Sequence, residues 1–333
     1  MAPAAPLMVR MAQLVRAAPP APPLPAAGPL ERALGNPLEA FETLEAFIAR
    51  LQAFATATAV APGVPFPWTD LERLMGQAVA MLEQSNDLFW LATRRPAPAD
   101  VDYLAFHHAR VAVMAVRVGT NLGYRRPELL ALGLAACLFD FGLLGVPEAT
   151  LRAAESASPE TEGSYRDHPR RAAALIRGWA PPYPSIAEAV LHHHEREHGQ
   201  GYPQGLTAEA IHPHATILGL VDLYTRLTVP PTWQPPQAPH EAVRQIVRHR
   251  HDAFPTDIIK ALLKEVSVFP PGTMVRLNTG ETGRVVHVNR QQPLRPRVSV
   301  VVDAKGHALS RPREVDLGDT PFLFITGATG GAR

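Results

Sequence analysis

Cysteine, lysine and long apolar runs are all scarce in this 333-residue sequence. Cys137 is the one cysteine, which excludes an intramolecular disulfide and a cysteine-cluster zinc site and fits a reducing compartment. No apolar run reaches the roughly 18 residues that a membrane span needs. Arg10 and Arg16 also interrupt what would be the apolar core of a signal peptide. The sequence therefore predicts a soluble, cytoplasmic protein.

Net charge is low as well, at +1. Lysine occurs only at Lys260, Lys264 and Lys305, so arginine supplies nearly all of the positive charge. A balance this close to neutral gives no electrostatic footprint for nucleic acid or for an anionic membrane. We therefore expect neither as a partner.

Proline, by contrast, is abundant, with 35 residues, and it is concentrated near the N-terminus. Composition and periodicity together divide the chain into five predicted parts. These are a disordered Pro/Ala-rich tail over 1–35, an N-terminal helical region over 36–98, a larger helical domain over 99–267, a small β-barrel-like domain over 268–325 and a flexible tail over 326–333.

Capping signals predict two helices in the N-terminal helical region. Asn36-Pro37-Leu38-Glu39 has a capping residue followed by proline at the first helical position. Thr69-Asp70-Leu71-Glu72 is a second capping box, and the helix that it opens should run to about Leu91. The two helices should pair as a hairpin and pack on the larger domain, because apolar helix faces need burial.

The rest of the chain is predicted to be helical until about residue 265 and then β-structured. Apolar residues at helical spacing predict helices over Ala99–Leu122, Pro127–Leu138, Arg166–Trp179, Ile186–Glu197, His214–Leu227 and Glu241–Val247. Short, alternating, β-branched segments predict antiparallel strands at Met274–Leu277, Gly283–Val288 and Val298–Val302. The predicted fold class is therefore mainly α: a helical bundle with an N-terminal helical hairpin and a small C-terminal β domain.

Histidines and aspartates placed on separate helices carry the chemical signal. Imidazoles and carboxylates that converge from several helices are how a bundle core holds divalent metal. Adjacent His193 and His194 would point about 100° apart on a helix, so both can serve one site only near a helix end. The glycines at 199 and 201 supply such an end. The candidate ligands are His107, Asp140, His168, His193, His194 and Asp222.

Four sequence motifs occur in a defined order along the helical part of the chain. They are His-x-x-Arg-Val from His107, Ala-Ala-x-x-x-Asp-x-Gly around Asp140, His-Pro at His168, and His-His-Glu-x-x-x-Gly-x-Gly-Tyr-Pro-x-Gly-Leu from His193. This series resembles the HD-GYP subgroup of the HD metal-dependent phosphohydrolases, which hydrolyse cyclic di-GMP at a centre of two or three ions, usually iron or manganese. The resemblance covers about half of the chain and implies an HD-type bundle. The segment from Pro270 to Leu317 also resembles a small β domain appended to some members.

The resemblance assigns roles to the candidate ligands. Asp140 matches the aspartate of the His-Asp doublet, the catalytic residue that bridges two metals. His107 and Asp222 match the other ligands of the first metal, and His168, His193 and His194 match those of the second. The segment with Gly199, Gly201, Tyr202 and Pro203 matches the Gly-Tyr-Pro motif, a surface for signalling partners such as diguanylate cyclases.

Three departures from the family pattern make the site degenerate. Phe139 stands where the family has the histidine of the doublet, and phenylalanine cannot bind metal. Leu143 stands where the family has a lysine that contacts substrate phosphate, and such clamps contribute strongly to transition-state stabilisation. Thr228–Thr232 replaces a basic stretch. The second site, with Asp140 and three histidines, keeps four ligands and can hold one ion.

Two functions follow from this pattern. The favoured one is a scaffold in bacterial cyclic di-GMP signalling with weakened or lost catalysis, which acts as a binding or regulatory module. The alternative is an active phosphodiesterase that hydrolyses cyclic di-GMP or a related phosphoester with one or two ions. Nine other histidines are interpreted as structural or solvent-facing: His108, His192, His212, His214, His240, His249, His251, His287 and His307. His198 stands where the family usually has an aspartate.

Overall fold

A computed structural model describes residues 35–58, 64–94, 102–146, 149, 151–152, 163, 165–249, 253–266, 268–269, 271–289 and 292–329. The predicted tail over 1–35 lies outside these ranges except for Gly35. The chain forms two compact units, Met1–Val221 and Asp222–Arg333. None of the helices in the described ranges combines the length and the apolar character that a membrane crossing requires.

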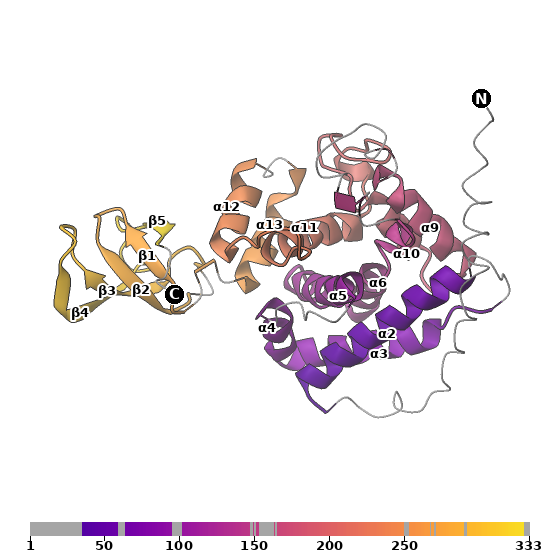
Figure 1. Ribbon diagram of the computed structural model, residues 1–333, viewed down its shortest axis with the longest axis horizontal. Helices are drawn as coiled ribbons and strands as arrows, with labels where there is room; N and C mark the ends of the chain where they lie inside the picture. The colour runs from indigo at the N-terminus through magenta and orange to yellow at the C-terminus, as the bar shows by residue number, and fades with distance from the viewer. Residues whose placement is uncertain are drawn as a thin grey trace. The chain divides into compact units, whose positions relative to one another are not determined.

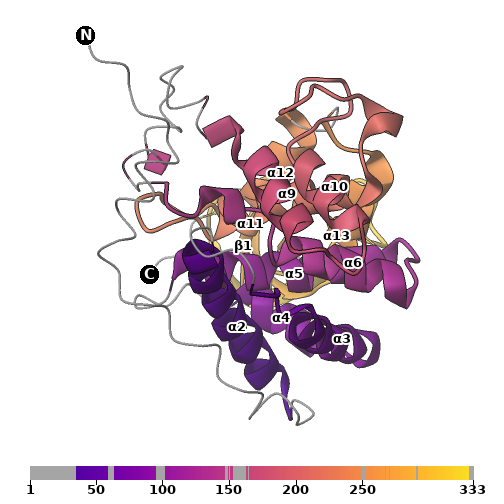
Figure 2. The same cartoon turned by 90° about the vertical axis from the view of Figure 1, so that its right-hand side faces the viewer.

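The N-terminal hairpin consists of α2 (Pro37–Thr58) and α3 (Trp68–Gln84), which pack side by side (Figures 1 and 2). Helix α2 begins where the sequence predicts, because the Asn36 side chain accepts a hydrogen bond from the Glu39 amide at 3.0 Å. Its apolar face is fully buried at Phe41 and Ile48. Burial of this face against the rest of the unit stabilises a helix that propensity alone would leave marginal.

The second predicted helix is in fact two, and this prediction was wrong in detail. Helix α3 ends at Gln84, and a separate helix α4 spans Asp87–Arg94. Ser85 is extended, and its hydroxyl accepts a hydrogen bond from the Asp87 amide at 3.2 Å, which starts the new helix. The capping box at Thr69 was also misplaced, since α3 already begins at Trp68 and its N-cap, Pro67, makes no side-chain cap.

Helix α5 (Tyr103–Asn121) forms the centre of the first unit. All of its residues from Ala105 to Val116 are buried, as expected of a helix enclosed on every side. It packs against α2, α3 and α4 and also against α6 (Arg126–Ala136). The Asp102 side chain caps its first turn by accepting from the Leu104 amide at 2.8 Å.

The hairpin docks on the later helices of the unit through aromatic residues. The Trp68 indole N–H donates to the Trp179 carbonyl at 2.7 Å, and Phe66 stacks on Trp179 at 4.5 Å between ring centroids. The Tyr183 hydroxyl donates to the Glu72 carboxylate at 2.7 Å. These contacts join segments about a hundred residues apart, so the hairpin and the helices that carry the histidines belong to one packed body.

Four further elements of the first unit carry or surround the candidate ligands. They are η2 (Phe141–Leu143), α9 (His168–Gly178), α10 (Ser185–His192) and η3 (Ala208–Ala210). Helix α10 was predicted to continue to Glu197 but ends at His192. His193 and His194 therefore lie in the turn that follows the helix, which frees them from helical spacing.

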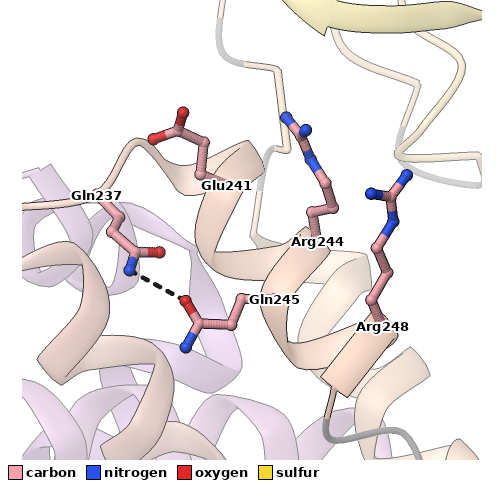
Figure 3. A pocket seen from close by; sticks show the side chains of 5 residues that line it. All are labelled: Gln237, Glu241, Arg244, Gln245 and Arg248. Atoms are coloured by element: carbon pink, nitrogen blue, oxygen red, sulfur yellow. Dashed lines mark hydrogen bonds between the residues drawn. The ribbon is translucent and has the colours of Figure 1, made fainter.

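The boundary between the units falls inside one continuous helix, α11 (Pro213–Thr228). In the second unit, α12 (Pro239–His249) and α13 (Thr256–Glu265) follow. Helix α12 carries most of a polar pocket, in which the Gln237 amide donates to the Gln245 side chain at 3.0 Å (Figure 3). Glu241, Arg244 and Arg248 complete its lining.

The C-terminal part of the second unit is an antiparallel sheet in the order β4-β3-β2-β1-β5 (Figure 1). Its strands are β1 (Met274–Leu277), β2 (Thr282–His287), β3 (Arg297–Val302), β4 (Ala308–Asp316) and β5 (Ile325–Ala328). Alternate residues, including Val275, Val285 and Val298, are buried. The predicted mainly α fold with a small C-terminal β domain is therefore confirmed.

The predicted flexible tail began too early. Thr326, Gly327 and Ala328 belong to β5, where Val275 pairs with Ala328 and Arg276 with Gly327. These small residues gave no hydrophobic alternation, so only pairing with β1 identifies the strand. The barrel-like form stays a prediction, because the pairings of the described strands define a sheet with two edges, β4 and β5.

Candidate metal centre

Asp140, His168, His193 and His194 form one buried cluster in the first unit. Each offers one ligand atom, and these atoms all lie within 4.8 Å of one another. Asp140 precedes η2, His168 is the first residue of α9, and His193 caps the C-terminus of α10. All four residues are at most 9% exposed. The four side chains therefore converge because each residue lies at or next to the end of a helical element.

Hydrogen bonds to backbone carbonyls fix the tautomers of two of these histidines. His168 Nδ1 lies 2.7 Å from the Tyr165 carbonyl oxygen, and His193 Nδ1 lies 2.6 Å from the Val190 carbonyl oxygen. A carbonyl oxygen only accepts, so each Nδ1 must carry the proton. In the neutral ring the Nε2 atom then keeps its lone pair, as it does in metal-binding histidines with a carbonyl partner.

The lone pairs of these two Nε2 atoms point at one another. The two atoms are 3.2 Å apart and lie 3.0 and 3.5 Å from Asp140 Oδ1, His168 being the nearer. Acceptors crowded in this way repel unless a cation lies among them. The buried Nε2 of His194 has no hydrogen-bond partner among the described residues. The donor set of three imidazoles and a carboxylate fits a divalent transition metal.

The pKa shifts place these groups in the protonation states that bind metal. Burial raises the pKa of the Asp140 carboxyl, but His168 and His193 opposite it outweigh this effect and hold it well below its usual range. Burial lowers the pKa of His168, and it lowers that of His194 further, with help from the neighbouring His193. These shifts favour a charged Asp140 carboxylate beside neutral imidazoles of His168 and His194, which is the form that ligates metal.

Three glycines allow other segments to touch the backbone of the ligand histidines. A side chain on any of them would collide with backbone, because helices and loops meet there without space for a Cβ. A Cβ would lie 2.0 Å from the His168 oxygen at Gly142, 2.2 Å from the His193 oxygen at Gly219 and 2.4 Å from the His194 oxygen at Gly201.

The segment after the paired histidines is closed into a loop by Glu195. This buried carboxylate accepts from the Gln204 amide at 2.6 Å and from the Leu206 amide at 2.9 Å. Gly199, Gly201, Tyr202 and Pro203 lie in this loop and are half-buried. Its role as a surface for signalling partners stays a prediction.

His107 on α5 and Asp140 are both buried in the first unit. Asp222 is also buried and is the residue directly after the unit boundary, in the middle of α11. Within the first unit the structure thus brings four of the six predicted ligands into one cluster, and metal binding by these residues is a proposal.

Phe139 and Leu143 are both buried in the segment that carries Asp140. The Phe139 ring is fully buried, with its centroid 4.8 Å from the ring of His108, 5.1 Å from that of His193 and 5.9 Å from that of His107. It meets His108 and His193 edge to face. Leu143 is 8% exposed in η2. Apolar packing therefore occupies both positions at which the family pattern has polar groups.

Three other histidines form a separate cluster. The His192 Nδ1 accepts from the His212 amide at 3.3 Å, and the His212 Nδ1 accepts from the His214 amide at 3.2 Å. Burial lowers the pKa of His214 to about 4, with a smaller contribution from His212. The Nδ1 atoms of His192 and His212 are occupied by backbone donors, which agrees with a structural role for these two residues, whereas the buried Nδ1 of His214 has no hydrogen-bond partner among the described residues.

The low pKa of His214 should make stability depend on pH. Between pH 6.5 and about 4 the unfolded chain binds a proton at this residue and the folded chain does not. The free energy of unfolding should therefore fall as pH falls through this window, by on the order of 1–3 kcal/mol. Denaturant unfolding of His214→Gln at pH 7 and pH 4.5 should show a smaller pH effect than the wild type. An equal pH effect in both proteins would contradict the assignment, and His198→Gln, an exposed histidine, serves as the control.

The fold and this geometry agree with the comparisons to known proteins. The family model described as "HD domain" matches residues 79–257, and a "KOW domain associated with HD domain" matches residues 274–331. The chain belongs to the HD domain family and, within it, to the HD-GYP subgroup of metal-dependent phosphohydrolases.

Two relatives of the chain are named as cyclic di-GMP phosphodiesterases. Cyclic di-GMP phosphodiesterase PA4108 of Pseudomonas aeruginosa is 29% identical over 65% of this chain and 52% of its own length. PdeB of Borreliella burgdorferi is 21% identical over 60% of this chain and 53% of its own length. The chain thus spans about half the length of these relatives. Bd1817, a HDG"Y"P protein from Bdellovibrio bacteriovorus, shares the fold, with a TM-score of 0.52 and 17% identity over 72% of this chain and 73% of its own.

Several residues that shape the centre were not assigned a role from the sequence. Glu195 was read only as part of a motif, although it holds the loop. Arg196 donates to the carbonyls of His193 and Glu195 at 3.0 and 2.7 Å and so satisfies the end of α10. The close contact at Gly219 could have been predicted from one feature of the sequence, since an isolated glycine inside a helical pattern often marks close packing.

Proposed function

We propose that this chain is a metal-binding HD-GYP module of bacterial cyclic di-GMP signalling whose phosphodiesterase activity is weakened or lost. The supporting observation is the contrast within one site. Asp140, His168, His193 and His194 are arranged as a complete ligand set, whereas Phe139 and Leu143 bury apolar side chains beside it. The module would bind a cyclic dinucleotide or a related phosphoester and act as a binding or regulatory partner of signalling proteins, such as diguanylate cyclases.

The residues present define what the site can and cannot do. Asp140 and the three histidines would hold an iron or manganese ion, which supplies Lewis-acid stabilisation of charge on a phosphoryl oxygen. His168 and His193 keep their Nε2 atoms aimed inward through their bonds to Tyr165 and Val190. Leu143 gives no hydrogen-bond donor to a phosphate, and loss of one such donor typically lowers kcat by roughly 100-fold or more.

An active phosphodiesterase is the second candidate, and the relatives of this chain that bear the name cyclic di-GMP phosphodiesterase favour it. In such an enzyme His107, Asp140 and Asp222 would hold a second ion, as the family resemblance implies. The outcome depends on whether His107, Asp140 and Asp222 can retain an ion without a fourth protein ligand.

Metal analysis combined with a hydrolysis assay tests the proposal. The purified chain, loaded anaerobically with iron(II) or with manganese, should retain about one ion and turn over cyclic di-GMP roughly 100-fold more slowly than an intact family member. His168→Ala should lose the ion, and His198→Ala, an exposed histidine outside the cluster, should keep it. Turnover equal to that of an intact family member would establish the second candidate, and absence of bound ion in the wild type would refute both.

A further inference from the structure

The three histidines of the four-ligand cluster are not held in the same way. His168 and His193 are each fixed by a hydrogen bond from Nδ1 to a backbone carbonyl. No such bond fixes His194, whose buried Nε2 has no hydrogen-bond partner within the described parts of the chain. A ligand imidazole normally needs a partner that orients its ring, so another contact must orient this one.

Aromatic contacts surround the His194 ring instead. Tyr202 lies nearly parallel to it, with ring centroids 4.6 Å apart and an interplanar angle of 23°. The ring of His168 meets it edge to face at 4.9 Å, and His193 lies at 4.1 Å with a tilt of 43°. Tyr202 is the one of these three neighbours that is not itself a candidate ligand. Its broad face restricts rotation of the imidazole about the bond that carries it.

Tyr202 is in turn held firmly in place. Its amide donates to the His194 carbonyl at 3.2 Å, so a backbone hydrogen bond accompanies the ring stacking between the two residues. The Arg166 guanidinium carbon lies 5.3 Å from the centroid of its ring. Arg170 donates to the Pro203 carbonyl at 2.7 Å. The bonds that Glu195 accepts from the same loop hold the remaining end.

We propose that Tyr202 is a positioning residue for the metal centre, which orients His194 by stacking in place of a hydrogen bond. The inference rests on the proposed metal-binding function of the same cluster. An imidazole that binds a cation is poorer in electrons, and the face of an electron-rich phenol ring attracts it more strongly. The Gly-Tyr-Pro loop therefore supports the metal centre directly, because the ring of Tyr202 orients the ring of His194.

Substitution of the ring tests this role. Tyr202→Leu and Tyr202→Met should weaken manganese binding about 10-fold, the lower end of the losses seen when a partner of a ligand is removed. Tyr202→Phe keeps the stacking face and should bind manganese with nearly wild-type affinity. Glu209→Ala, an exposed change just beyond the loop, serves as the control. Affinity is measured by calorimetry, the melting temperature of the metal-free proteins is compared, and the visible spectrum of the cobalt(II)-loaded forms reports ligand geometry.

Each outcome decides a separate point. The positioning role is supported if the Leu or Met variant binds manganese more weakly and has an altered cobalt spectrum. Its metal-free melting temperature must be unchanged, and the Phe variant must restore the affinity. Unchanged affinity in the Leu and Met variants overturns it and leaves the proposed function standing. Equal losses in the Phe and Leu variants overturn it in favour of the hydroxyl group. The Met variant, which is flexible and of similar length, replaces the Leu variant if that protein does not fold. A wild type that binds no manganese overturns both proposals.

Discussion

The double variant Phe139→His with Leu143→Lys is expected to take up about one further metal ion per chain and to gain phosphodiesterase activity. The Phe139 ring already lies beside His107 and His193, so an imidazole of similar planar shape would join existing ligands. Lysine at 143 would restore the charge and the hydrogen-bond donor that the family pattern has there. Because one such donor is worth roughly 100-fold in kcat, hydrolysis of cyclic di-GMP should rise by at least that factor.

Stability gives an independent measurement on the same variant. Without metal, a buried imidazole at position 139 leaves polar atoms unpaired at a cost of about 1–3 kcal/mol. Metal that binds only the folded state offsets this cost, so manganese should raise the melting temperature of the variant more than that of the wild type.

Single substitutions separate the contributions to this rescue. Phe139→His alone should add the ion without the full gain in rate, and Leu143→Lys alone should add neither. If the double variant binds the extra ion but stays inactive, the missing basic stretch at Thr228–Thr232 becomes the cause. If it folds and binds no extra ion, the first site is remodelled beyond Phe139 and the rescue prediction is wrong.

Gly142→Ala is expected to damage the centre almost as severely as loss of a ligand. A Cβ at this position would lie 2.0 Å from the His168 carbonyl oxygen and 2.8 Å from its carbon, both backbone atoms that cannot rotate away. Either η2 or the start of α9 must move, which displaces Asp140 or His168 relative to the other. We expect a loss of about 3 kcal/mol in the free energy of unfolding and a loss in manganese affinity of roughly 100-fold.

Gly178→Ala is the matched control for this substitution. Gly178 is the last residue of α9, and a Cβ there would meet nothing within 4 Å. Alanine should be neutral or stabilise the helix by up to about 1 kcal/mol. Urea unfolding and manganese titration of the two alanine variants, side by side, check the prediction. Equal behaviour would show that the contact between Gly142 and His168 is easily relaxed.

The candidate ligands were predicted from residue type and motif, and their role as metal ligands stays a prediction. His193 and His194 could be recognised as a pair that needs a helix end, and α10 does end at His192. The helix boundaries of α6 and α11 followed closely from apolar periodicity, because their packing repeats along each helix. Such features depend on residues that are close in the sequence, so the sequence alone indicates them. Helix α5 begins at Tyr103, after an extended Asp102, and not at Ala99 as predicted.

The features that were missed depend on bonds to backbone groups or on contacts between helices, which residue types do not specify. The break at Ser85 requires the Ser85 side chain to bond the Asp87 amide in place of continuing α3. The approach of Gly219 to His193 joins two helices, and no local pattern specifies it. The carbonyls of Tyr165 and Val190 that fix the imidazoles belong to the backbone, so their residue types carry no signal.

The hydrogen bond between His193 and the Val190 carbonyl also has a thermodynamic consequence. That carbonyl lies in the last turn of α10, where helix carbonyls lack intrahelical partners, so one bond both ends the helix and orients a candidate ligand. The rotamer of His193 is therefore selected when the helix forms. Binding of the proposed ion would then lose little side-chain conformational entropy, and this preorganisation would favour affinity.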